Sequence, residues 1–221
     1  MKKVLVVAPH ADDETIGCGG TLLKHSENGD QINWLIATSI EGISADKKVI
    51  EDRDKLISLV SKAYNFSNTF QLGFPTTMLD TIAKRDIVSS FNEVFLQVKP
   101  EIIYVPYRLD VHSDHEVVFD AAISCSKSFR NPSVKIIRAY NTLSETEFGL
   151  RPEDTGFKAN CYNDVSDFFE DKLNILELYK SEMSDHPFPR SIDSIRAQAI
   201  LNGSSANCKF GESFITLKEI L

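Results

Sequence analysis

The chain of 221 residues is long enough for one sizeable hydrophobic core and short for two. Its apolar fraction of 42% and charged fraction of 25% are typical of soluble globular proteins, and its net charge of −8 disfavours binding to phosphate backbones or anionic membranes. We therefore expect a single domain over residues 1–221, without a nucleic-acid or membrane partner.

Strand-like and helix-like segments alternate along the first part of the chain. The expected strands are Val4–Val7, Ile32–Thr38, Thr69–Leu72, Ile102–Val105 and Val134–Tyr140. The expected helices run from about Thr15 to Asn28-Gly29, across Lys48–Tyr64, from Ile87 to Val98 before Pro100, and from Val117 to Cys125. Such alternation predicts an α/β fold with a Rossmann-like, doubly wound, mainly parallel sheet.

The pattern changes after about Phe157. A strand-like segment is followed by helices near Val165–Lys180 and Ile192–Asn202 and by a final strand near Phe210–Thr216. We interpret these elements as a C-terminal α+β extension of the same domain.

The cysteines and the N-terminus favour a cytoplasmic protein. The four cysteines are far apart and form no CxxC pair, so reduced, mostly buried thiols are the simplest interpretation. The apolar run Val4–Val7 is too short for a signal peptide, and no segment approaches the length of a membrane span.

Polar clusters follow two of the expected strands. The run His10–Glu14 comes directly after the first strand, and Asp110–His115 follows the strand that ends near Pro106. Ligands of open α/β sheets bind beyond the carboxyl ends of the strands, so we expect both clusters at the same end of the sheet. Three of the five histidines lie in these clusters, whereas His25 and His186 are expected to be ordinary surface or turn residues.

The residue types of the two clusters are those of a zinc site. His10 and Asp13 are three residues apart on a strand-to-helix loop and can turn toward one ion, with a third ligand from the run His112–His115. Two histidines and one aspartate leave an open position, where the pKa of a water molecule falls far below its bulk value. Asp12 is then free to accept a proton from that water.

The second cluster predicts its own helix start. Ser113 and Glu116 fit a capping box, which starts the helix at Asp114 and puts His115 in the first turn. His112, in the loop before it, is free to stabilise or protonate a tetrahedral intermediate. Asp110 or Asp114 is expected to orient the His112 ring.

Simpler interpretations exist for the same residues. Asp12 or Asp13 alone would most often cap the following helix, although two aspartates followed by glutamate are more acidic than a cap requires. The run Gly17–Gly20 is a weak match to a dinucleotide-binding fingerprint because Leu22 occupies the third glycine position. Close packing of the first helix on the sheet explains these glycines better.

At these residues the sequence resembles the PIG-L/LmbE family of zinc-dependent de-N-acetylases, over nearly the whole chain. The family's opening His-Pro-Asp-Asp-Glu motif and glycine-rich helix start stand here as VLVVAPHADDETIGCGGTL, and its His-x-Asp-His motif stands as His112–His115. Further matches are Arg53, Leu72–Pro75, Tyr179–Glu182, Pro189–Ser191 and Glu212–Phe214. Ala11 and Ser113 replace two frequent prolines, and Thr76 stands where many members carry aspartate.

The resemblance implies roles for individual residues. The implied zinc ligands are His10, Asp13 and His115, for one ion per chain, although iron or cobalt could occupy the same ligands. The implied catalytic residues are Asp12 as general base, His112 as oxyanion stabiliser and Asp114 paired with His112. Arg53 is implied to contact the substrate, and Arg190 is a weaker candidate for that role.

The expected substrate is a small N-acetylated sugar. The family acts mostly on N-acetylglucosamine-type groups, and a soluble acidic chain favours a soluble sugar derivative. Two alternatives stay open: metal-assisted phosphoester hydrolysis, and a non-catalytic, metal-stabilised sugar-binding module. The first would normally need further carboxylates or nearby basic residues, and the second would not need Asp12 and His112 beside three ligands. The oligomeric state, a homo-oligomer included, is not fixed by the sequence.

Overall fold

The computed structural model describes residues 1–42, 46–150 and 155–221, and its strands form one seven-stranded sheet. The strands are β1 (Lys3–Ala8), β2 (Gln31–Ser39), β3 (Asn68–Pro75), β4 (Ile102–Pro106), β5 (Ile136–Tyr140), β6 (Cys161–Asp164) and β7 (Gly211–Glu219). Their order across the sheet is β3-β2-β1-β4-β5-β7-β6, and every neighbouring pair is parallel except the two that involve β7. The expected doubly wound, mainly parallel sheet is therefore confirmed.

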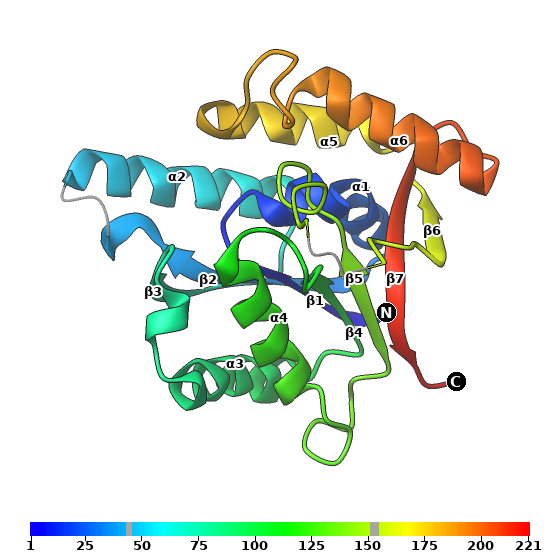
Figure 1. Cartoon of the computed structure of the whole chain (residues 1–221). Helices are drawn as coiled ribbons and strands as arrows, with labels where there is room; N and C mark the ends of the chain where they lie inside the picture. The colour runs from blue at the N-terminus through cyan, green and yellow to red at the C-terminus, as the bar shows by residue number, and fades with distance from the viewer. Residues whose placement is uncertain (43–45, 151–154) are drawn as a thin grey trace.

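Helices cover both faces of the sheet (Figure 1). They are α1 (Asp13–Glu27), α2 (Lys47–Ala63), α3 (Lys84–Val98), α4 (Ser113–Cys125), α5 (Phe169–Leu176) and α6 (Ile192–Ala206), with short 3₁₀ helices η1 (Ile40–Gly42), η2 (Leu79–Thr81) and η3 (Glu177–Glu182). Helices α3 and α4 lie on one face, α1 and α2 lie on the other, and α5 and α6 lie outside α1. Over the residues that the structure describes, no helix has the length and apolar character needed to cross a membrane.

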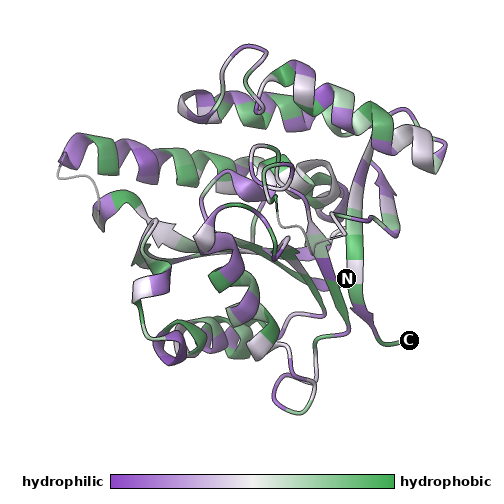
Figure 2. Cartoon of the chain, in the orientation of Figure 1, coloured by the Kyte–Doolittle hydropathy of each residue, from purple (hydrophilic) through white to green (hydrophobic). Residues whose placement is uncertain are grey.

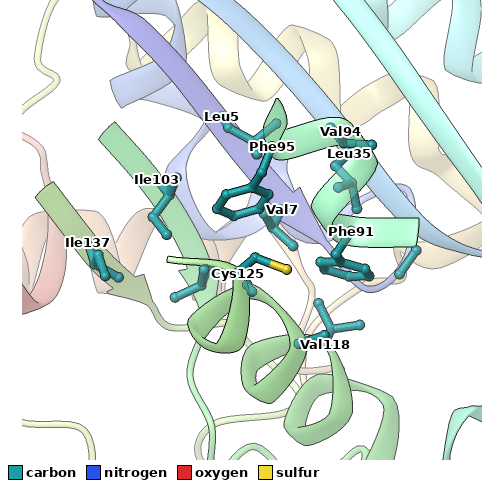
Figure 3. Close-up of a cluster of buried hydrophobic side chains, with 14 of the residues drawn as sticks. Leu5, Val7, Leu35, Phe91, Val94, Phe95, Ile103, Val118, Cys125 and Ile137 are labelled. Atoms are coloured by element: carbon teal, nitrogen blue, oxygen red, sulfur yellow. The ribbon is translucent and has the colours of Figure 1, made fainter. Parts of the chain in front are cut away.

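The central strands are apolar on both faces because helices bury both. Leu5 and Val7 of β1 point toward α3 and α4, where they meet Phe91 and Phe95 (Figure 3). Val4 and Val6 belong to a second cluster on the opposite face. Figure 2 shows the same division, with apolar strands between helices that are apolar on one side only. This sandwich of helices and sheet positions the loops at the strand ends.

The C-terminal elements complete the domain edge through a buried ion pair. Lys172 Nζ of α5 lies 2.7 Å from Glu212 Oε1 of β7, and both side chains are almost fully buried. Glu212 also accepts hydrogen bonds from the peptide N–H groups of Gly20 and Thr21, at 2.9 and 2.7 Å. The strand β7 thus holds the middle of α1 in place.

Helix α1 begins at Asp13, earlier than expected, and is interrupted at Cys18, which has non-helical φ and ψ angles of −146° and 22°. The N–H groups that Glu212 accepts belong to Gly20 and Thr21, which follow this kink closely. A Cβ atom on Gly17 would overlap the ring of Tyr140 on β5, and one on Gly20 would overlap Val165. Close packing therefore explains these glycines, as the sequence suggested.

We expect Gly17→Ala to destabilise the protein by about 1–3 kcal/mol, the usual cost of overpacking a core. In an unconstrained helix the same change stabilises by roughly 0.5–1 kcal/mol, so the sign of the effect is diagnostic. Urea unfolding of the variant would measure it, with a substitution at the exposed end of the same helix, Glu27→Ala, as control. A more stable Gly17→Ala protein would contradict the packing of α1 against Tyr140.

Candidate metal centre

Two loops meet where the strand order of the sheet reverses. The adjacent strands β1 and β4 are parallel and lead into helices α1 and α4 on opposite faces of the sheet. Such a switch point is where open α/β sheets bind ligands. The structure brings potential ligand atoms of His10, Asp13 and His115 within 4.8 Å of one another at this position.

The three side chains are arranged around one carboxylate. Asp13 Oδ2 lies 3.3 Å from His10 Nδ1 and 3.4 Å from His115 Nε2. The same oxygen accepts a hydrogen bond from the peptide N–H of His10 at 2.9 Å. Asp13 Oδ1 and His115 Nε2 are buried and have no hydrogen-bond partner among the described residues. Buried polar atoms are rarely left unsatisfied, so these two atoms fit a ligand set for a cation.

Asp110 fixes the orientation of the His115 ring. Its Oδ2 lies 2.7 Å from His115 Nδ1, and its Oδ1 accepts the Thr146 hydroxyl at 2.6 Å. A ring that donates from Nδ1 presents the lone pair of Nε2 toward Asp13, as a metal ligand requires. Sequence reasoning assigned Asp110 only to His112, and Thr146 gave no sequence signal.

The carboxylates of the site raise the pKa values of the His10 and His115 imidazoles, so they favour a positive charge at this position. Burial by itself would lower the pKa of His115, but the effect of Asp13 and Asp110 is larger and raises this pKa to about 10. Burial likewise lowers the pKa of His10, and hydrogen bonds to Asp114 and Asp13 raise it to about 9. A divalent cation between these groups would supply the charge that the protons otherwise provide.

A second group of potential ligands, His10, His112 and Asp114, overlaps the first. Its atoms already have partners: Asp114 Oδ2 contacts His10 Nε2 at 3.1 Å and accepts the Thr77 N–H at 2.8 Å. His112 Nδ1 accepts the peptide N–H of Asp114 at 3.1 Å. The unsatisfied atoms lie in the group with Asp13 and His115, which is therefore the better candidate.

The expected capping box of α4 is wrong. The helix begins at Ser113, and the His112 side chain caps it by accepting the Asp114 N–H. Because Nδ1 accepts this hydrogen bond, a neutral His112 carries its proton on Nε2, and burial together with the nearby His10 lowers its pKa. His112 is therefore arranged as a neutral hydrogen-bond donor rather than as the protonated acid that its neighbouring aspartates suggested.

The expected pairing of Asp114 with His112 is also weaker than predicted. The closest approach of Asp114 Oδ2 to His112 Nδ1 is 3.9 Å, whereas the same oxygen lies 3.1 Å from His10 Nε2. The physical reason is the peptide N–H of Asp114, which occupies His112 Nδ1 and leaves the carboxylate to His10 and the backbone of Thr77 and Leu79.

Asp12 lies beside the candidate ligands with one oxygen held and one without a partner. Arg190 Nη1 lies 2.7 Å from Asp12 Oδ2, whereas Oδ1 is buried and has no partner among the described residues. Burial and the neighbouring Asp13 raise the pKa of Asp12, and Arg190 opposes that rise. The side chain makes no cap hydrogen bond to α1, which removes the simpler interpretation of this aspartate.

Glu14 supports the loop that carries Asp12. It is fully buried, accepts the Asp12 N–H at 3.1 Å and the Tyr179 hydroxyl at 2.8 Å, and burial raises its pKa to about 8. Sequence reasoning gave neither residue a role. Tyr179 lies in one of the C-terminal segments that matched the family, so that match was the available signal.

The two arginines expected to bind substrate contact the site differently. Arg53 donates to Ala11 O at 2.8 Å, pairs with Glu182 at 3.3 Å and lines a cavity of about 40 Å³ beside His10.

Arg190 instead contacts Asp12, Ser144 and Glu145, so its guanidinium holds the predicted base in position. Glu145 had no sequence signal. Thr76 lines the same cavity as Arg53.

The family model PIG-L, described as GlcNAc-PI de-N-acetylase, matches residues 5–126, more than half of the chain. The chain belongs to the PIG-L family. The matched region includes both loops of the candidate metal centre, the strands β2, β3 and β4, and β1 from Leu5 onward.

Individual members and neighbours agree with this placement. A probable N-acetyl-α-D-glucosaminyl L-malate deacetylase 2 of Bacillus cereus is 24% identical over 190 residues, which cover 82% of this chain and 84% of that protein. The structure of the N,N′-diacetylchitobiose deacetylase of Pyrococcus horikoshii superposes with a TM-score of 0.76 at 20% identity, covering 98% of this chain and 84% of that one.

The fold is also shared beyond deacetylases. The 4-carboxy-2-hydroxymuconate hydratase GalB of Pseudomonas putida has a TM-score of 0.75 at 16% identity, covering 100% of this chain and 98% of that one. Similarity at these identities establishes the PIG-L-like fold alone. The reaction has to be argued from the side chains.

Proposed function

We propose that this PIG-L protein is a metal-dependent hydrolase that removes the acetyl group from a small N-acetylated sugar of the N-acetylglucosamine type. The observation that carries the proposal is the set of the half-buried His10 and the buried Asp13 and His115, which lies beside an aspartate with a partnerless oxygen. Names of two relatives, a glucosaminyl-malate deacetylase and a diacetylchitobiose deacetylase, support the substrate class.

The residues fit a hydrolytic mechanism around one zinc ion held by His10, Asp13 and His115. A divalent cation there would polarise the amide carbonyl and lower the pKa of the attacking water. Asp12 Oδ1 has no other hydrogen-bond partner and accepts the proton of that water, while Arg190 holds Oδ2. His112, with Nδ1 occupied by the α4 backbone, donates from Nε2 to the developing oxyanion.

The proton taken up by Asp12 is then available to the leaving amine. Burial and Asp13 raise the pKa of Asp12, which favours this proton acceptance and return. Arg53, at the cavity beside His10, is placed to contact the substrate. The products are acetate and the free amino sugar.

The phosphoester alternative is less well supported. The arginines near the site are neutralised by carboxylates: Arg190 by Asp12 and Glu145, and Arg53 by Glu182. A phosphate would have to displace these pairs. The sugar-binding alternative does not account for the unpartnered Asp12 oxygen next to the ligand set.

We expect the purified protein to contain close to one divalent metal per chain and a chelator to abolish its activity, because three protein ligands leave one position open. Elemental analysis, with activity measured before and after chelation and after zinc is restored, checks this. Metal-free protein whose activity a chelator does not change would contradict the proposed centre.

The function itself is tested by acetate release from a panel of N-acetylated sugars, with sugar phosphates as the competing substrates. Acetate release from an N-acetylglucosamine derivative supports the proposal. Phosphate release without acetate release would favour the phosphoester reaction, and binding without turnover of any substrate would favour the sugar-binding module.

A further inference from the structure

A second cavity lies at the opposite end of the sheet from the candidate metal centre. It has a volume of about 140 Å³, on the order of ten times what one water molecule requires. Its walls are the amino ends of β1, β4 and β5 and the C-terminal turns of α1. The cavity is therefore large enough to hold a small polyatomic ligand group as well as water.

The walls of this cavity are positively charged although the chain carries a net charge of −8. Lys2, Lys24 and Arg138 line it together with His25, and no aspartate or glutamate is among its lining residues. A local concentration of cations in an acidic protein creates a positive potential that attracts anions.

Arg138 is the central group of the cavity. Its Nε is buried and has no hydrogen-bond partner among the described residues, although the guanidinium interacts with the Tyr104 hydroxyl on the neighbouring strand β4. None of the ion pairs of the described residues involves this arginine. On the neighbouring strand β7 it faces the uncharged Thr216, and the acidic Glu219 is opposite Ile136 instead. Arg138 as a whole is half-buried, and a buried N–H of a guanidinium without a carboxylate partner is costly unless a ligand satisfies it.

The remaining polar groups form a fixed frame around Arg138. His25, expected to be an ordinary surface or turn residue, is mostly buried and lies 2.8 Å from Asp30 Oδ2 and 3.0 Å from the Tyr104 hydroxyl. Asn163 donates to Thr21 at 3.1 Å, and Lys24 Nζ donates to the backbone oxygen of Asp164 at 3.0 Å. The carboxylate of Asp30 is engaged by His25 and by the peptide N–H of Lys2, and that of Asp164 accepts hydrogen bonds from Ser166.

We propose that this cavity binds a phosphate group, with Arg138 as the principal contact and Lys24 and Lys2 as further cationic contacts. A guanidinium binds phosphate oxygens in a bidentate manner, and lysines add point charges. Two or more cations around one cavity match a divalent phosphate better than a monovalent carboxylate. The phosphate is either free inorganic phosphate or the phosphate of a small metabolite. This inference does not depend on the proposed function, because the cavity shares no residue with the metal centre.

Isothermal titration of the whole protein with inorganic phosphate, at constant ionic strength, tests the proposal. We expect one site per chain, binding weakened about tenfold or more in Arg138→Gln, and weakened binding in Lys24→Gln, because hydrogen bonds to charged groups are lost. Lys62→Gln removes the same charge from an exposed position of α2 and should leave binding unchanged. Lys24→Gln decides the matter should Arg138→Gln not fold.

Parallel titrations separate the sources of the phosphate and the competing site. Tighter binding of glucose 6-phosphate than of inorganic phosphate assigns the cavity to a phosphorylated metabolite, and the reverse assigns it to the free ion. His115→Ala should keep phosphate binding. Binding that is lost in His115→Ala but kept in both cavity variants, or no binding up to about 10 mM, would overturn the proposal.

Discussion

Asp12→Asn is expected to keep the metal and to lower the rate of acetate release by about a hundredfold or more, the usual contribution of a general base. Asparagine has nearly the shape of aspartate and can still bond to Arg190 through its carbonyl oxygen. It cannot accept the proton of the attacking water, the role that we propose for the partnerless Oδ1. Metal content and turnover measured on the same preparation give the result.

Glu145→Gln is the matched control. Glu145 also contacts Arg190, at 3.3 Å, and the substitution removes the same charge without touching the predicted base. We expect its effect to be less than about tenfold, as for an indirect contact whose loss leaves the Asp12–Arg190 pair in place. Wild-type turnover in Asp12→Asn would show that Asp12 is not the base, and equal losses in both variants would assign the effect to Arg190.

The two histidines of the second loop are expected to separate metal binding from catalysis. His115→Ala should lose most of the metal and, with it, the activity, because His115 Nε2 is the buried, unpartnered nitrogen beside Asp13. His112→Asn should keep the metal and lower turnover by about two orders of magnitude, as expected when one oxyanion donor is removed. Asparagine is chosen because it can still cap α4.

Metal content decides between the two assignments. His10→Ala serves as a second ligand variant, since His10 is less buried than His115 and its replacement leaves a smaller internal cavity. Metal lost from His112→Asn but retained in His115→Ala would exchange the two roles. Metal retained in all three variants would place the ligands elsewhere.

The order and type of the elements follow from local patterns that the sequence contains. Continuous apolar runs such as Val4–Val7 predict strands buried on both faces, and the helical spacing from Ile87 to Val98 predicts α3. Because parallel strands with crossover helices align their carboxyl ends, these patterns also bring His10 and His115 to the same end of the sheet.

The hydrogen-bond and ion-pair partners of individual side chains could not be predicted from local sequence patterns. The capping box at Ser113 was wrong because the helix already begins at Ser113, where His112 is the N-cap residue and its ring accepts the Asp114 N–H. Arg190 was expected to bind substrate but lies against Asp12, since the segment before α6 folds back over the first loop. Sequence spacing carries no information about such contacts across more than a hundred residues.

The sequence by itself determined the α/β class, the family and the two loops that carry the candidate ligands, because hydrophobic periodicity and short motifs are local properties. Tertiary structure alone decided which atoms of those loops have no partner and which residues hold them. Tyr179, Arg190 and Glu212 reach the first loop and α1 from the C-terminal extension. The cationic cavity around Arg138 likewise exists only because three strand ends and the end of α1 converge.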